Sequence, residues 1–497
     1  MHCCAKTLNF KSPTPFHHEP FSTFPQNPKL PFSISRPLPR SHCSVFSRAK
    51  LRVEIPLPKH SLNPYSSSLN GSTSVHDANS KGVALKAVDV STLGNLCVDV
   101  VLNVPTLPPA NKEDRKAYMD RLAASEPDKR FWEAGGNCNV AIAAARLGLN
   151  CVAIGHVGNE IYGRFLLDVL RNEGIGFVGV NEDNDFPESS AASHETLLCW
   201  VLVDSLQRHG FCSRADFSKD PAFSWLGILS AEVKMAIKNS KILFCNGYGF
   251  DELPPGIIVS ALEYAIEVGT AIFFDPGPRG KSLSAGTPEE QDALNHLLTK
   301  SDVILLTADE AETLTGIDNP ILAGQQLLKQ AVRTKWVIVK MGSKGSILIT
   351  TSSIAFVPAF KVDVVDTVGC GDSFVSAIAF GFINGLPMVN TLSIANAVGA
   401  ATAMGCGAGR NVASLEKVVQ LMRESNFNYD DMFWEELFDV NLDVQEVTIL
   451  SKMATKGSNN RLICVSSESV VSELLPIFEP QLLEGKSSIL KEQMEVQ

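Results

Sequence analysis

Short apolar runs alternate with helical stretches from about Gly82 to Glu424. Apolar runs bounded by turn residues predict buried strands, and Glu289–Thr299 is typical of the helices between them. The predicted strands are Ala87–Gly94, Cys151–Gly155, Ile242–Asn246, Ala271–Asp275, Val303–Leu306 and Trp336–Lys340. Strands that alternate with helices form a mostly parallel sheet with helices on both faces. The pattern therefore predicts an α/β fold with a three-layer α/β/α arrangement.

Two stretches depart from this alternation. Residues Thr196–Asp204 alternate differently from these strands and are followed by Ser-Leu-Gln-Arg-His-Gly210, which predicts a β-hairpin. Residues Pro105–Trp132 form a charged insertion.

The first eighty residues differ in composition from the rest. They contain 11 of the 27 prolines and 14 serines, with nine basic residues against three acidic ones. Such a segment cannot bury a core, and its composition is typical of an organelle transit peptide, with a disordered linker as the plainer alternative. We expect residues 1–82 to be a disordered transit peptide for the chloroplast stroma, with the mitochondrion the less favoured destination.

The remainder is acidic, with 34 basic and 51 acidic residues and a net charge of −17. This charge disfavours nonspecific nucleic-acid binding. No apolar run reaches the ~18 residues of a membrane span. Nine cysteines remain, without a C-x-x-C pair, which argues against a zinc site or a disulfide framework.

Residues 426–497 form an acidic C-terminal extension with 13 acidic and five basic residues. Its first part mixes Phe433, Trp434 and Leu437 with acidic residues, which fits either a helix docked on the main fold or a partner-binding segment. We favour docking, because exposed aromatic residues promote association. The expected main domain is then 83–425.

The segment Asp366-Thr-Val-Gly-Cys-Gly-Asp-Ser-Phe374 carries the strongest chemical signal. An apolar helix follows it, so the amides of Gly369, Cys370 and Gly371 are expected at a helix N-terminus, where they can hold an anion. A carboxylate at Asp372 would repel a phosphate unless it accepts a proton from the attacking group. The alternative is that Asp372 only caps the helix.

This nonapeptide resembles the C-terminal signature of the ribokinase or pfkB family of carbohydrate kinases, D-T-x-G-A-G-D-x-F, with Cys370 at the usual alanine. The resemblance implies a ribokinase-like fold with a small β-sheet lid. It makes Asp372 the catalytic base, makes Gly369, Cys370 and Gly371 an anion hole, and places Asp366 near a monovalent-cation site, with K⁺ as the expected cation. The predicted hairpin then belongs to the lid, and the insertion elaborates it.

An upstream block, Gly135-Gly-Asn-Cys-Asn139, resembles the family's sugar-binding signature, although one residue is missing between Gly136 and Asn139. By resemblance Gly135, Gly136 and Asn139 line the sugar pocket. Close packing is the alternative for a Gly-Gly turn. Asp99 follows the first strand and, by the same resemblance, binds sugar hydroxyls. A turn residue is the alternative there.

The nucleotide side is less regular. Val337–Gly345 resembles the family's strand and G-x-x-G turn, which assigns Lys340, Gly342 and Gly345 to ATP, although a plain hairpin turn explains the glycines equally well. Asn396 is a candidate for the adenine pocket. Asp275-Pro-Gly-Pro-Arg279 resembles a D-P-x-x-R stretch near the active cleft.

The segment Thr307-Ala-Asp-Glu310 stands where the family has N-x-x-E, whose side chains organise the water shell of Mg²⁺. Glu310 is retained, and Thr307 replaces the amide with a single hydroxyl. The resemblance thus predicts an ATP- and Mg²⁺-dependent phosphotransferase acting on a hydroxymethyl group of a sugar or nucleoside. The alternative is a catalytically weakened, fructokinase-like structural subunit of a plastid complex. The partners expected beyond the substrate are a second copy in a homodimer or a plastid protein.

Overall fold

The computed structural model describes residues 86–180, 195–206, 208–438, 440, 444–456 and 462–495. The predicted transit peptide lies outside the described residues. Seven parallel strands in the order β11-β10-β9-β8-β1-β4-β5 make up most of the main sheet. They are β1 (Val88–Leu93), β4 (Cys151–Gly155), β5 (Gly176–Gly179), β8 (Ser240–Asn246), β9 (Ala271–Asp275), β10 (Val303–Thr307) and β11 (Trp336–Lys340).

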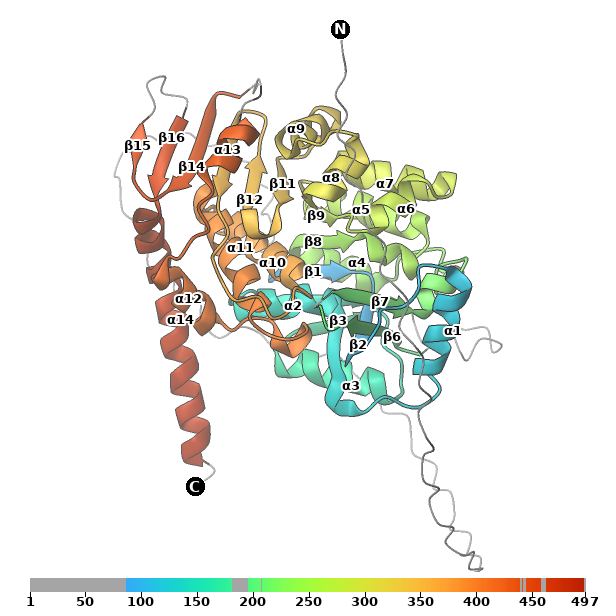
Figure 1. Ribbon diagram of the computed structural model, residues 1–497. Helices are drawn as coiled ribbons and strands as arrows, with labels where there is room; N and C mark the ends of the chain where they lie inside the picture. Colours follow the sequence, from blue (N-terminus) through green and yellow to red (C-terminus); the bar gives the residue numbers. More distant parts are fainter. Residues whose placement is uncertain are drawn as a thin grey trace, which may run out of the picture. The chain divides into compact units, whose positions relative to one another are not determined.

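Helices cover both faces of this sheet (Figure 1). Side chains of a strand point alternately to its two faces, and on β8 Ile242 and Phe244 join one hydrophobic cluster while Leu243 joins the other. The helices are α2 (Asn137–Arg146), α3 (Ile161–Asn172), α4 (Ala231–Asn239), α5 (Pro255–Glu267), α6 (Arg279–Ser284), α7 (Pro288–Lys300), α8 (Ala308–Thr315), α9 (Pro320–Gln330), α10 (Cys370–Ile383), α11 (Met388–Ala403) and α12 (Leu415–Glu424). The predicted three-layer α/β fold is confirmed.

A separate small sheet has the order β3-β2-β6-β7. Its strands are β2 (Leu96–Asn103), β3 (Trp132–Gly136), β6 (Leu197–Val203) and β7 (His209–Ser213). The antiparallel pairing of β6 with β7 is the predicted hairpin. Helix α1 (Lys112–Leu122) lies within the charged insertion and beside β7, where the Arg115 guanidinium donates to the carbonyl of Phe211. The insertion therefore packs on the small sheet, as expected.

The C-terminal extension continues the main sheet. Beyond β11, the antiparallel strands β12 (Ser346–Ile349) and β13 (Ser353–Val357) are followed by β14 (Glu446–Ser451) and β16 (Leu462–Ser466), both parallel to β13 (Figure 1). The remaining elements are α13 (Asp431–Phe438), β15 (Thr455–Lys456) and α14 (Ser467–Glu495). Trp434 and Leu437 are buried against β11 to β13. Residue 425 thus does not mark an end of the sheet, because the extension supplies strands and core residues to it.

Candidate active site

The carboxyl ends of four neighbouring strands place polar side chains along one edge of the main sheet. Parallel strands end at a common edge, which is where ligands bind in α/β proteins. The last residues of β8, β9, β10 and β11 are Asn246, Asp275, Thr307 and Lys340.

Asp372 lies in the first turn of α10, beside this edge. Gly369 precedes the helix with φ +75°, and a Cβ there would come within 2.5 Å of the Cβ of Ala408, so only glycine fits. The side-chain amide of Asn139 donates to Oδ2 of Asp372 over 3.1 Å, and Asn139 accepts from the backbone amide of Gly409 over 2.8 Å. The sequence-predicted sugar residue Asn139 therefore holds the predicted base.

The electrostatics of Asp372 suit a proton acceptor. Burial, assisted by Asp275, raises its pKa to about 6 against the hydrogen bond from Asn139 and the charge of Lys340. A carboxyl with a pKa near neutrality is a better base than an ordinary aspartate. Because Asn139 is a neutral group, this hydrogen bond leaves the negative charge of Asp372 in place.

Lys340 lies between the strand edge and the turn before α10. Its Nζ is 2.6 Å from Oδ2 of Asp275 and 3.7 Å from the position of a Cβ on Gly371. Burial lowers the pKa of Lys340, but Asp275 and Glu310 outweigh burial and raise it above its ordinary value. A charged ammonium group thus lies beside the amides that were predicted to form the anion hole.

Thr307 and Glu310 form a capping box at the start of α8. The Thr307 hydroxyl accepts from the amide of Glu310 over 3.2 Å, and Oε2 of Glu310 accepts from the amide of Thr307 over 2.8 Å. Burial and then Asp275 raise the pKa of Glu310, and Lys340 opposes them. The cap therefore brings Glu310 into the cluster around Lys340.

Asp99 is a buried carboxylate on β2 of the small sheet. A Cβ on Gly135 would lie 2.2 Å from Oδ1 of Asp99, so this glycine makes room for the carboxylate. The thiol of Cys97 contacts Oδ1 over 3.4 Å. Burial raises the pKa of Asp99 to about 7, and Asp372 adds to the effect. The next glycine, Gly136, has φ +59° and turns the chain into α2.

A family model described as pfkB family carbohydrate kinase matches residues 116–414, which are more than half of the chain. The chain belongs to the pfkB family of carbohydrate kinases. Fructokinase-1 of Oryza sativa subsp. japonica is 29% identical over 247 residues, 49% of this chain and 72% of that protein. A 5-dehydro-2-deoxygluconokinase of Geobacillus kaustophilus is 26% identical over 319 residues, 61% of this chain and 84% of that protein.

A solved structure shows the same fold. The structure of Arabidopsis thaliana ribokinase complexed with ribose and ATP has a TM-score of 0.51 and 20% identity, covering 67% of this chain and 98% of that one. The part of this pfkB chain that the structure describes contains no group of three or more His, Cys, Asp or Glu side chains able to hold a metal ion. No helix of the described part is long and apolar enough to cross a membrane.

Three predicted nucleotide residues of this pfkB chain have structural contacts or turns of their own. The side chain of Asn396 is buried, donates to the carbonyls of Val357 and Pro358, and accepts from Ser346 over 2.9 Å, so it ties α11 to the sheet. Gly342 and Gly345 have φ values of +55° and +109° in the turn between β11 and β12. These two glycines are required by the turn itself.

Cys370 begins α10, where a helix N-terminus would lower the pKa of a thiol. Here burial is stronger: it raises the pKa of Cys370 to about 12, with Asp366 and Asp372 adding to the effect. Cys370 therefore acts as a small side chain in the place of alanine.

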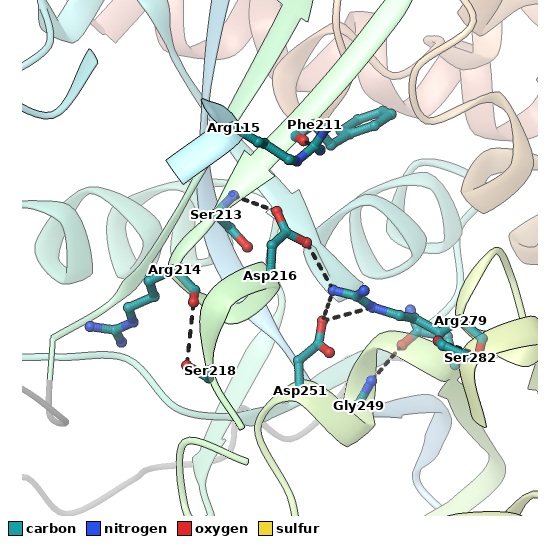
Figure 2. A network of polar contacts seen from close by, with 11 residues as sticks. Arg115, Phe211, Ser213, Arg214, Asp216, Ser218, Gly249, Asp251, Arg279 and Ser282 are labelled. Atoms are coloured by element: carbon teal, nitrogen blue, oxygen red, sulfur yellow. Dashed lines mark hydrogen bonds and ion pairs between the residues drawn. The ribbon is translucent and has the colours of Figure 1, made fainter. Parts of the chain in front are cut away.

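Arg279 belongs to a network that the sequence did not reveal (Figure 2). Its Nη2 lies 3.1 Å from Oδ1 of Asp216 and 2.8 Å from Oδ2 of Asp251, and its guanidinium lies over the ring of Tyr248. Asp216 also accepts from the amide of Ser213 over 2.8 Å, at the end of β7. The network joins the small sheet to the edge of the main sheet. The D-P-x-x-R resemblance was the one signal that pointed to it.

Proposed function

We propose that this chain is an ATP-dependent kinase that phosphorylates a hydroxymethyl group of a neutral sugar, with Asp372 as its base. The observation that carries the proposal is the position of Asp372, beside the amides at the start of α10 and with its pKa raised to about 6. Asp372 accepts the proton of the attacking hydroxyl, and Asn139 holds the carboxylate in place. Asp99, on β2 of the small sheet, accepts hydrogen bonds from sugar hydroxyls.

In this proposal Lys340 and the amides of residues 369–371 bind the transferred phosphate. A helix N-terminus and an ammonium group stabilise the charge that develops on the transferred phosphate. Mg²⁺ in such sites is held by one or two carboxylates together with the phosphates, and it neutralises the phosphate charge. Glu310 and Asp275 fit this requirement, since both flank Lys340. Glu310 would reach the metal through water, with the Thr307 hydroxyl beside it.

The charges favour a neutral substrate over an acidic sugar. The two carboxylates assigned to the sugar, Asp99 and Asp372, already interact unfavourably, since Asp372 raises the pKa of Asp99. Arg279, the cation of the neighbouring network, is paired with Asp216 and Asp251. A carboxylate on the substrate would therefore meet like charges and would have to break an existing pair.

A coupled assay for ADP release tests this proposal with fructose, ribose, adenosine, inosine, pseudouridine and 5-dehydro-2-deoxygluconate. We expect a neutral sugar to give the highest kcat/KM. The highest value for 5-dehydro-2-deoxygluconate would reject the neutral-sugar assignment. A highest value for a nucleoside would also reject it, but would keep Asp372 as the base. No turnover with any acceptor would reject the kinase and favour a structural subunit.

We also propose that the protein is located in the chloroplast. The composition of the first eighty residues supports this, because it is serine-rich, basic and poor in acids. A fluorescent protein fused behind residues 1–82 should enter plastids and lose the leader there. Fluorescence in the cytosol at the full fused length would reject the proposal.

A further inference from the structure

Asp366, the first residue of the pfkB signature, is contacted by a side chain from the small sheet. Nε2 of His209, the first residue of β7, lies 2.5 Å from Oδ1 of Asp366. The side chains of His209 and Asp366 are 14% and 2% exposed. The ring nitrogen is close to the carboxylate but is not aligned for a hydrogen bond.

Two backbone amides donate hydrogen bonds to the Asp366 carboxylate. The amide of Val368 donates to Oδ1 over 2.9 Å, and the amide of Gly407 donates to Oδ2 over 2.6 Å. A buried carboxylate requires such partners. With His209 on the same oxygen as Val368, donors occupy both oxygens of this carboxylate.

These contacts do not fit a monovalent cation bound to Asp366, which the family signature implies. A hard cation needs several oxygen ligands around it. The atoms that contact the Asp366 carboxylate are nitrogens of His209, Val368 and Gly407, and the imidazole ring takes up the space beside Oδ1.

We propose that His209 replaces the monovalent cation at Asp366, so that this kinase works without K⁺. His209 acts as a positioning residue: Asp366 begins the loop that leads through Gly369 to Asp372, and the imidazole fixes that loop against β7. The ring is itself supported by Phe211, with the two ring centres 6.5 Å apart. The part of the proposal that concerns rate rests on the proposed kinase function.

The first experiment measures rate against monovalent cation, with the full-length chain prepared in choline chloride. We expect wild-type rates in KCl and choline chloride at equal ionic strength to agree within about twofold. His209→Ala should lose about tenfold in choline chloride, the usual range for residues that support a site, and should regain part of the loss in KCl. His209→Gln has a side chain closer in volume to histidine. It is used for the same test if the alanine variant does not fold.

The matched control is His296→Ala, because His296 also neighbours an aspartate, Asp292 at 3.4 Å, but on the outer helix α7. It should behave as wild type in both salts. A wild-type rate at least fivefold higher in KCl than in choline chloride would overturn the proposal. Equal behaviour of both His209 variants and wild type would overturn it as well.

A second experiment does not depend on turnover, so it separates this inference from the proposed function. Thallium(I) serves as the probe for a K⁺ site and is observed by its NMR line width during titration. Wild type should cause no saturable broadening, whereas His209→Ala should cause it. Amide hydrogen exchange in peptides spanning 366–371 should be faster in His209→Ala than in wild type. Saturable thallium binding to wild type, or unchanged exchange in the variant, would reject the inference even if no sugar is phosphorylated.

Discussion

Buried carboxylates have different partners at the two ends of the parallel strands. At the amino ends, Asp302 lies 2.6 Å from Arg333 and 3.2 Å from Lys335, and Asp89 lies 2.7 Å from Lys241. At the carboxyl ends Asp275 is paired with Lys340 at 2.6 Å, but Asp372, in the first turn of α10 beside that edge, is held by a neutral amide, and its pKa is raised to about 6. Paired carboxylates stabilise a fold, whereas a strongly shifted pKa in a cleft is typical of a functional group. Carboxylates that hold the fold together, such as Asp302, can therefore be distinguished from Asp372, which has the properties of a catalytic group.

The largest expected effect comes from the carboxyl end. Asp372→Asn keeps the shape of the side chain but removes the proton acceptor, so kcat should fall by about 10²–10⁴. Urea unfolding should show no loss of stability, because a buried charge is removed. The substrate identified in the acceptor screen is used for this measurement. Retention of more than a tenth of wild-type kcat would remove Asp372 from the mechanism.

The corresponding change at the amino end should act on stability instead. Asp302→Asn leaves Arg333 and Lys335 without their partner and weakens the bond to the amide of Ile272, which is 2.9 Å long. We expect a loss of about 2 kcal/mol in the free energy of unfolding, the range for a buried group that loses a charged partner. The kcat of the folded variant should equal that of wild type. A lower kcat with unchanged stability would contradict the distinction between the two ends.

Much of this distinction could be predicted from the sequence. Asp275 and Lys340 are close in space because parallel strands share an edge, and the apolar runs identified those strands. The nonapeptide placed Asp372 at the start of a helix. The contacts of Arg279 and His209 with their aspartates could not be predicted from spacing, because each joins the small sheet to distant residues. For Arg279 the D-P-x-x-R resemblance gave the one signal. Some strands were also missed. Glu446–Ser451 alternates as a strand does, but the acidic composition around it favoured an appended segment. Strand β5 is too rich in glycine to give a hydrophobic pattern.

The pH dependence of the rate sharpens the comparison. Folding raises the pKa of Asp372 from 3.8 to about 6, so the base is protonated and inactive below pH 6 and ionised above it. The rate should therefore fall about tenfold per pH unit below that value and level off above it. For Asp302→Asn the same profile is expected, since Asp302 lies at the other end of the strands. A profile flat down to pH 4 would show that Asp372 titrates as an ordinary aspartate.

The smallest effect is expected at the capping box of α8. Thr307 uses its hydroxyl oxygen on the amide of Glu310, so it contributes less to a magnesium-bound water than a side-chain amide would. Asparagine is also a good N-cap, and Thr307→Asn should therefore lower the Mg²⁺ concentration for half-maximal rate a few-fold without loss of stability.

Glu310→Gln provides the opposite change at the same cap. It keeps a side-chain oxygen for the amide of Thr307 but removes the charge, so the half-maximal Mg²⁺ concentration should rise by about tenfold. Both variants are titrated with Mg²⁺ at fixed ATP beside wild type. Three superimposable curves would mean that Thr307 and Glu310 serve only the helix. The Lys340 cluster would then resemble the amino-end ion pairs, with carboxylates that hold the sheet together and take no part in binding the metal.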